Sequence, residues 1–250
     1  MYQFFVEPVQ IRLDDRRVVI LGEDVNHIRN VLRMKPGEEL NVSNGKDGRE
    51  YRCAILALED DQVLCELRFV KEAQVELPSR IHLFQGLPKG DKMEWIIQKC
   101  VELGIYQIIP VTMKRCVVKL DGKKAQAKVA RWQGIAQAAA KQSKRGVVPE
   151  VTEVVDFARA MEMAADMDVR LLPYELAEDM GQTRQAIERL VPGQSIAIFI
   201  GPEGGFDETE VARAVEGGAL PVTLGRRILR TETAGMTVLA WLVYRLEGIN

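Results

Sequence analysis

The stretch SIAIFIGPEGGFDETEVARAVEGG, at 195–218, decides the fold class of this chain. Its first six residues are a short apolar run typical of a buried strand. Asp207 and Glu210 have the spacing of a capping box and predict that a helix begins directly after them. The turn GPEGGF joins the two elements. A strand, a turn and a helix in this order are the repeating unit of a sheet with parallel strands.

The same alternation of apolar runs and helical segments continues on both sides of this stretch. A helix at 91–104 has a capping signal at Asp91 and Glu94 and an apolar face formed by Met93, Ile96, Ile97, Cys100 and Val101. Several strand candidates are apolar on both faces, as in a sheet covered on both sides. These candidates are 80–87, 106–113, 150–155, 168–175, 194–201 and 220–225. The pattern predicts an α/β domain with a mostly parallel sheet.

The first 72 residues have a different pattern. Their apolar runs, at 2–6, 16–21, 39–43, 51–58 and 62–70, are typical strands, and a short helix is expected around 24–34. Asn44-Gly45 and Asp47-Gly48 accept the backbone angles of tight turns. The polar stretch 71–79, which contains Pro78, is the candidate linker. We therefore expect a small β domain at 1–72 and an α/β domain at 73–250.

The charges are distributed unevenly although the formal net charge is only -2. Residues 80–145 contain 14 basic and 4 acidic side chains, whereas 146–224 contain 5 basic and 15 acidic ones. A basic block of this size indicates an anionic partner such as a nucleic acid. Two blocks that face each other, or that are simply solvated, would give the same pattern.

Composition excludes several classes of protein. With 47% hydrophobic and 28% charged residues, the chain has an ordinary globular composition. No apolar run is long enough for a membrane helix, and the first residues lack the pattern of a signal peptide, so we expect a cytoplasmic protein. The spacing of the four cysteines matches neither a redox motif nor a zinc site, and two histidines cannot form a multi-histidine metal site. We therefore expect no metal.

Three strand-to-helix junctions are the candidate ligand loops, because ligands bind outside the carboxyl ends of strands in open α/β sheets. They are LLPYE at 171–175, IGPEGGF at 200–206 and LGRRILRTETAG at 224–235. The glycines let the backbone approach a ligand closely. Helix capping would explain the threonines and the glutamate of the third junction, but it does not explain the three arginines upstream of them. An arginine cluster beside a glycine-rich loop suits a substrate whose reacting group is or becomes anionic.

Two further segments are candidates for contact with nucleic acid. The helix that ends in QSKRG, 142–146, carries cations that would either interact with the negative end of the helix dipole or bind phosphates. In HIRNVLR, 27–33, Arg29 and Arg33 could hold an RNA backbone. His27 fits a structural hydrogen-bonding role as well as an RNA contact.

Five segments, in order, closely resemble the ribosomal RNA small subunit methyltransferase E family of the SPOUT class. They are HIRNVLR, KGDKMEWIIQKCVELGI, RW followed by QSKR, IGPEGGF and LGRRILRTETA. The sequence departs from the family at QAAAKQS, where glutamates are expected before the Gln-Ser pair. The resemblance implies a PUA-like β-barrel followed by a domain whose end is threaded into a trefoil knot, in a homodimer.

The resemblance also implies an activity: transfer of a methyl group from S-adenosylmethionine to N3 of uracil 1498 in 16S rRNA, with the assembled 30S subunit as the expected substrate. The residues expected to bind the cofactor are Leu172, Pro173, Tyr174, Glu175, Ile200, Gly201, Pro202, Glu203, Gly204, Gly205, Leu224, Gly225, Ile228, Leu229, Thr233 and Ala234. The residues expected to contact RNA are His27, Arg29, Arg33, Lys89, Lys92, Gln142, Ser143, Lys144 and Arg145.

The expected chemistry assigns roles to residues of two loops. Arg230, with Arg227 second, is expected to stabilise the uracil anion that forms when N3 loses its proton. Glu232 or Glu203 is expected to orient an arginine or to take that proton. Three alternatives remain at this point: a related enzyme that methylates a tRNA ribose 2′-hydroxyl, a non-catalytic small-subunit RNA-binding factor, and, more distantly, an NAD enzyme. The last lacks the GxGxxG fingerprint.

Overall fold

The computed structural model describes residues 1–177 and 179–247, which form two compact units. Unit one contains Met1–Glu76 and Ala140–Val148, and unit two contains Leu77–Ala139 and Pro149–Asn250. The first division lies close to the boundary expected at 72/73. The second is a new feature, because a nine-residue segment from the middle of the chain belongs to the unit that the N-terminal residues build. Each unit is described separately below.

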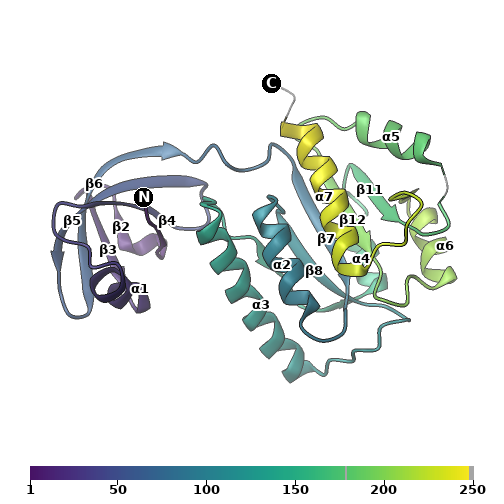
Figure 1. Cartoon of the computed structure of the whole chain (residues 1–250), viewed down its shortest axis with the longest axis horizontal. Coiled ribbons are helices and arrows are strands. Elements are labelled where there is room, and N and C mark those ends of the chain that lie inside the picture. The colour runs from purple at the N-terminus through teal and green to yellow at the C-terminus, as the bar shows by residue number, and fades with distance from the viewer. Residues whose placement is uncertain (178, 248–250) are drawn as a thin grey trace. The chain divides into compact units, whose positions relative to one another are not determined.

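Unit one is a curled six-stranded sheet with the strand order β1-β4-β5-β6-β3-β2 (Figure 1). Strand β1 pairs with β4 in parallel, and the other neighbours are antiparallel. Register shifts between β5 and β6 mark irregularities that favour curling of the sheet. The strands are β1 (Gln3–Phe5), β2 (Ile11–Arg12), β3 (Arg17–Leu21), β4 (Glu39–Ser43), β5 (Arg49–Leu58) and β6 (Gln62–Glu72).

The core of unit one follows from alternation along these strands. Val18 and Ile20 of β3 are buried, as are Leu40 and Val42 of β4, because every second residue of a strand points to the same face. A short helix, α1 (Glu23–Asn26), continues as a π-helical turn over His27–Val31 and adds the fully buried Ile28 to this core. The alternating apolar pattern therefore places one face of the sheet inside.

Unit two contains a seven-stranded sheet in which every pairing is parallel. Its strand order is β10-β8-β7-β12-β11-β13, and β9 pairs with β8. The strands are β7 (Arg80–Gly86), β8 (Gln107–Thr112), β9 (Glu150–Val151), β10 (Val155–Asp156), β11 (Val169–Pro173), β12 (Ser195–Ile200) and β13 (Leu220–Val222). The predicted α/β class and parallel sheet are confirmed. The single strand expected at 150–155 is wrong, because β9 and β10 are separate.

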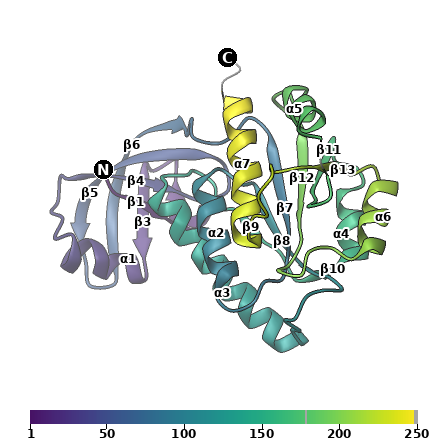
Figure 2. The ribbon, with the colours of Figure 1, turned by 45° about the vertical axis from the view of Figure 1, so that its right-hand side comes forward.

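Helices cover both faces of this sheet. Phe84 of β7 stacks on Phe199, which contacts Phe157 of α4, whereas the neighbouring Leu83 faces Gly235 of α7. Since consecutive residues of a strand point to opposite faces, α4 and α7 lie on opposite sides. Helices α2 and α7 lie side by side (Figure 2). The helices are α2 (Lys92–Glu102), α3 (Gly122–Gln142), α4 (Phe157–Ala164), α5 (Met180–Glu188), α6 (Glu208–Glu216) and α7 (Thr231–Glu247).

The sequence predicted where two helices begin, but only one of the two predicted side-chain caps is present. The capping box of Asp207 and Glu210 is present, and α6 begins at Glu208. The hydrogen bonds from Thr209 and Lys114 hold the pKa of Asp207 at about 2. Helix α2 begins after Asp91 as expected, but the Asp91 side chain makes no capping hydrogen bond. The apolar face predicted for this helix is buried as expected.

All four cysteines are buried free thiols. Burial raises the pKa of Cys53, Cys65 and Cys100 to about 12. Thiols in this state are poor nucleophiles and poor metal ligands. No helix among the described residues is both long enough and apolar enough to span a membrane.

Candidate active site

The three junction loops meet in unit two around a cavity of about 370 Å³. They follow β11, β12 and β13, which are adjacent parallel strands, so their carboxyl ends lie at one edge of the sheet. The cavity is lined by Lys92, Pro173, Tyr174, Glu175, Ile200, Gly201, Pro202, Glu203, Gly205, Phe206, Thr223, Leu224, Gly225, Arg226, Arg227, Ile228, Leu229, Arg230, Thr231 and Ala234. The predicted loops therefore form one site.

Close backbone approach explains two glycines at this site. A Cβ atom on Gly86, at the end of β7, would lie 2.7 Å from the backbone nitrogen of Pro202. Gly205 has a φ of 70°, a left-handed conformation that side chains other than glycine rarely adopt. Gly86 therefore lets the loop after β12 pass close to the end of β7, and Gly205 provides the backbone turn that this loop needs.

A buried hydrogen-bond relay connects the end of β7, the loop after β12 and the start of α7. The carboxamide nitrogen of Gln85 donates to Thr231 Oγ1 at 2.9 Å, and the Thr231 hydroxyl donates to the carbonyl oxygen of Gly201 at 2.6 Å. Gln85 is fully buried and Thr231 is nearly so. The sequence analysis did not single out Gln85, and it considered Thr231 only as part of the third candidate loop, where helix capping would explain it. The relay fixes the orientation of the Gly201 peptide in the cavity wall.

A second cluster joins Lys92 to the two glutamates that were expected to act on the reacting base. Lys92 Nζ lies 2.8 Å from Glu203 Oε1 and 3.6 Å from Glu232 Oε2. Burial raises the pKa of Glu203, but the hydrogen bonds from Lys92 and from the Lys89 backbone N–H outweigh it and leave the pKa below its usual value. The hydrogen bond to Glu203 raises the pKa of Lys92. Within the described residues, both carboxylates pair with this lysine and neither pairs with an arginine.

The arginines of the third loop line the cavity and remain accessible. Arg226, Arg227 and Arg230 are exposed, and no hydrogen bond or ion pair joins their guanidinium groups to other residues of the described chain. The backbone carbonyl of Arg230 accepts from Thr233 and Ala234 N–H, so this residue is fixed at the start of α7. The cavity is therefore lined by guanidinium groups that can donate hydrogen bonds to an anionic ligand.

Most residues expected to bind a cofactor line this cavity, and three do not. Leu172 is fully buried in the sheet, and Gly204 packs against Arg115. Thr233 lies within the first turn of α7, outside the lining residues. Of the four residues expected to act on the base, Glu232 is also outside the lining, whereas Glu203, Arg227 and Arg230 are part of it. The lining also includes Phe206, Arg226 and Thr231, which belong to the candidate loops but were not among the residues expected to bind the cofactor, and Thr223, which lies just outside those loops.

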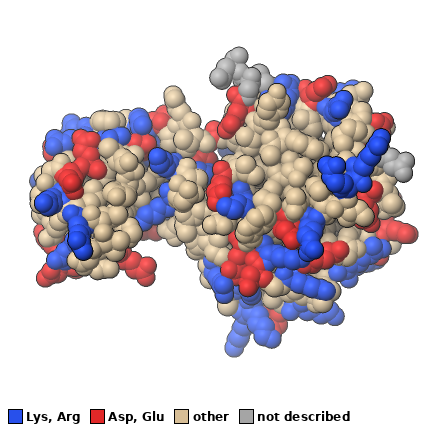
Figure 3. All heavy atoms as spheres, viewed as in Figure 1, with Lys and Arg blue, Asp and Glu red and all other residues tan. Residues whose placement is uncertain are grey.

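The residues expected to contact RNA fall into two groups by environment. Arg33, Lys89, Gln142 and Lys144 are exposed. Arg29 is half-buried and binds Asp60 and the Glu59 carbonyl, and His27 packs edge-on to Phe4. In the space-filling view, Lys and Arg side chains gather over the N-terminal end of α3 (Figure 3).

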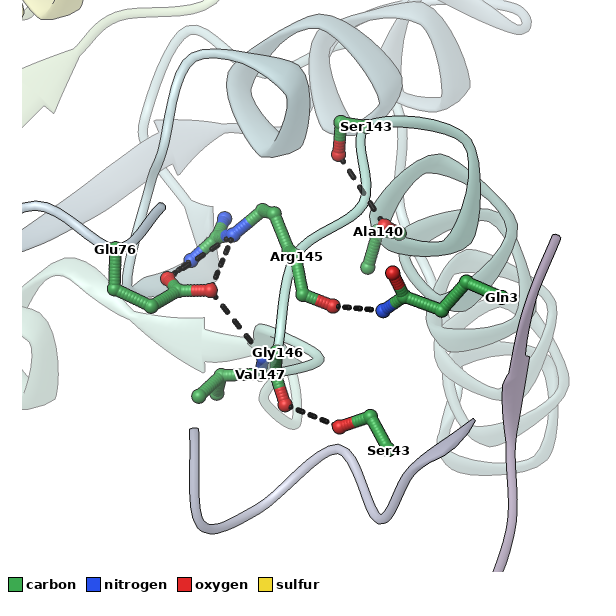
Figure 4. Close-up of polar contacts among 8 residues, drawn as sticks. All are labelled: Gln3, Ser43, Glu76, Ala140, Ser143, Arg145, Gly146 and Val147. Atoms are coloured by element: carbon green, nitrogen blue, oxygen red, sulfur yellow. Dashed lines mark hydrogen bonds and ion pairs between the residues drawn. The ribbon is translucent and has the colours of Figure 1, made fainter. Parts of the chain in front are cut away.

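Ser143 and Arg145 belong to the Ala140–Val148 segment of unit one (Figure 4). The Arg145 guanidinium pairs with Glu76, with Nε 3.1 Å from Oε2, and its side chain is only 5% exposed. The Arg145 carbonyl accepts from Gln3, and the Gly146 carbonyl accepts from Ser43. Arg145 therefore has the environment of a residue that anchors this segment, in contrast to the exposed Lys144 beside it.

Comparison with known proteins identifies relatives along the whole chain. The family model described as an RNA methyltransferase domain matches residues 75–243, and the model described as an RNA methyltransferase PUA domain matches residues 20–68. The ribosomal RNA small subunit methyltransferase E of Bacillus subtilis is 39% identical over 99% of this chain and 98% of its own length. The protein of the same name from Synechocystis is 30% identical over 99% of this chain and 78% of its own.

Two solved structures with a bound cofactor are similar to this chain. The ribosomal RNA small subunit methyltransferase E of Neisseria gonorrhoeae, bound to S-adenosylmethionine, has 35% identity and a TM-score of 0.82 over 96% of both chains. A putative methyltransferase of Legionella pneumophila, also with bound S-adenosylmethionine, has 32% identity and a TM-score of 0.79 over 96% of this chain and 94% of its own.

Proposed function

The chain belongs to the ribosomal RNA small subunit methyltransferase E family, and we propose that it transfers a methyl group from S-adenosylmethionine to N3 of uridine 1498 in 16S rRNA. The observation that carries the proposal is the cavity in unit two, which three loops after adjacent parallel strands line with glycines and with three accessible arginines. The full-length similarity to family members supports the ribosomal RNA substrate.

The cavity has the size and chemistry that this cofactor needs. Its volume of about 370 Å³ is within the range of about 300–1,000 Å³ that is typical of small-molecule sites. Apolar side chains for a flat aromatic base are present at Ile200, Leu224, Ile228 and Leu229. Residues of all three loops line the same space. The residues that would hold the cofactor are those of the predicted set that line the cavity, together with Phe206 and Thr231.

The residues of the chain position the base and stabilise its charge. When bound, S-adenosylmethionine supplies a methyl group that its own positive sulfur has already activated. N3 of uracil carries a proton, and the negative charge left by its loss spreads over two flanking carbonyl oxygens. Arg230, with Arg227 second, lines the cavity and is assigned to donate to these oxygens, because guanidinium donors stabilise such an anion strongly.

The two candidate glutamates differ in their suitability as a base. Glu203 already accepts from Lys92 and from the backbone of Lys89, and its lowered pKa makes it a poor proton acceptor. Glu232 has one carboxylate oxygen that is buried without a hydrogen bond, although Lys92 lies 3.6 Å away. Of the two, Glu232 is therefore the better candidate to take the N3 proton.

We propose that RNA contacts unit one and the basic side chains beside the cavity. The contact residues are His27, Arg29, Arg33, Lys89, Lys92, Gln142, Ser143 and Lys144. Arg145 is not included among these contacts, because its guanidinium pairs with Glu76. Because N3 lies on the pairing edge, the target base has to be unpaired or flipped out before it enters the cavity. The proposal also includes a homodimer and a trefoil knot formed by the cavity loops. Its substrate is the assembled 30S subunit, and its location is the cytoplasm.

The test is methyl transfer from labelled S-adenosylmethionine to small ribosomal subunits that lack native modification, followed by nucleoside mass spectrometry. N3-methyluridine at a single site is the expected product. A 2′-O-methylated nucleoside, formed most readily on tRNA, would retain the cofactor and overturn the target. Tight RNA binding without transfer would indicate a non-catalytic small-subunit factor instead.

We expect Thr231→Val to weaken the binding of S-adenosylmethionine about 10-fold. The valine has the same shape but leaves a Gln85 N–H and the Gly201 carbonyl without their partner, and an unsatisfied buried group costs about 1–3 kcal/mol. Titration calorimetry with the cofactor measures the change. The matched control is Thr231→Ser, which keeps the hydroxyl and should bind within about twofold of the parent. Equal affinity of the valine variant would show that the relay does not position the cofactor loop.

A further inference from the structure

Lys92 is held in one place before any ligand arrives. It is the first residue of α2, it lines the cavity, and its side chain is 30% exposed. Its ammonium group lies 2.8 Å from Glu203 Oε1 and 3.6 Å from Glu232 Oε2. Glu203 belongs to the loop after β12 and lines the cavity, whereas Glu232 belongs to the first turn of α7 and lies outside the lining, so two separate segments hold this one cation.

The ammonium group has hydrogen-bonding capacity left over. It carries three N–H donors, and within the described residues its partners are the two glutamates. The remaining donor is available to a group in the cavity. Because the hydrogen bond to Glu203 raises the pKa of Lys92, the side chain stays charged and acts as a donor rather than as a base.

Preorganisation distinguishes Lys92 from the three arginines of the site. The guanidinium groups of the arginines are exposed and have no partner within the described chain, so a ligand has to order these side chains when it binds. Lys92 is already ordered by its ion pairs. Fixed donors aimed at the position where charge develops contribute most to catalysis, because they need no reorganisation during the reaction.

We propose that Lys92 is a catalytic residue that donates a hydrogen bond to a carbonyl oxygen of the target uracil and stabilises the N3 anion. This inference rests on the proposed function and deepens it. It replaces the expectation that Lys92 contacts the RNA backbone with a contact to the reacting base. Glu203 and Glu232 position the lysine in this arrangement, and Glu232 keeps its proposed role as the acceptor of the N3 proton.

The test compares Lys92→Met, Lys92→Arg and Lys99→Met in single-turnover methyl transfer with saturating RNA and cofactor. Lys99 lies on the same helix, pairs with Glu102 and does not line the cavity, so its variant controls for loss of a charge from α2. We expect Lys92→Met to lower the rate about 100-fold. Lys92→Arg should recover part of the rate, and Lys99→Met should match the parent.

The pH profile separates a contact to the base from other roles. If Lys92 favours the N3 anion, the defect of Lys92→Met has to shrink as the pH rises toward values at which free uridine ionises. Cofactor affinity of the variant should stay within about twofold of the parent, which shows that the cavity is intact. A normal rate with a raised RNA requirement would overturn the proposal in favour of a phosphate contact.

Two further outcomes are also decisive. A defect that is the same at every pH, together with weak cofactor binding, would show that Lys92 only supports the loop after β12 and would overturn the proposal. The unsubstituted protein is measured in the same assay. If it forms no N3-methyluridine, the proposed function itself fails, and that result differs from a failure limited to Lys92.

Discussion

Arg230→Ala is expected to lower the single-turnover rate of methyl transfer by about 100–1,000-fold with saturating RNA and cofactor. Arg230 lines the cavity, and its guanidinium has no competing partner within the described chain. Its backbone carbonyl caps the first turn of α7, and alanine keeps that interaction. The substitution therefore removes the side-chain donor and leaves the loop geometry in place.

The controls for this prediction use other arginine substitutions. Arg230→Lys keeps the charge but loses the planar pair of donors, so we expect an intermediate rate. Arg184→Ala removes an exposed arginine of α5 that does not line the cavity, and its rate should equal that of the parent. Rapid-quench measurements of product give the rates directly. A normal rate for Arg230→Ala would exclude this arginine from stabilising the anion and would leave Arg227 as the candidate.

Arg145→Ala is expected to destabilise unit one by about 1–3 kcal/mol, because the guanidinium is buried but the Glu76 side chain that remains is 24% exposed. The side chain is 5% exposed and pairs with Glu76, whose carboxylate also accepts from the backbone N–H of Val147. Removal of the guanidinium leaves this carboxylate partly buried and uncompensated. Thermal unfolding should shift to lower temperature, and hydrogen exchange should accelerate in β1 and β4, which contact the same segment through Gln3 and Ser43.

The neighbouring residue provides the matched control. Lys144 is exposed and has a φ of 60°, so Lys144→Gly removes a cation and relieves a strained backbone at the same time. We expect this variant to be as stable as the parent or slightly more stable, and to bind RNA more weakly. If Arg145→Ala instead kept its stability and lost only RNA affinity, Arg145 would be an RNA contact, as its place in the sequence suggested.

The sequence predicted those parts of the site that depend on local signals. The capping box at Asp207 and Glu210, the apolar runs and the glycine-rich turn were enough to place the three loops at the ends of strands. Parallel strands end at one edge, so the convergence of the loops also followed from the pattern. Side-chain partners could not be derived in this way. Glu203 or Glu232 was expected to orient an arginine or to take the N3 proton, and the ion pairs of both with Lys92 were not foreseen.

Sequence by itself determined the α/β class, the location of the β domain and the loops of the cavity, because helix caps, strand alternation and turn residues act within a few positions of the chain. Only the tertiary structure decided which polar groups meet. Gln85 and Thr231 are 146 positions apart, Lys92 and Glu203 are 111 apart, and Glu76 and Arg145 are 69 apart. Hydrogen bonds and ion pairs need contact in space, and no local pattern encodes which distant groups the folded chain brings together.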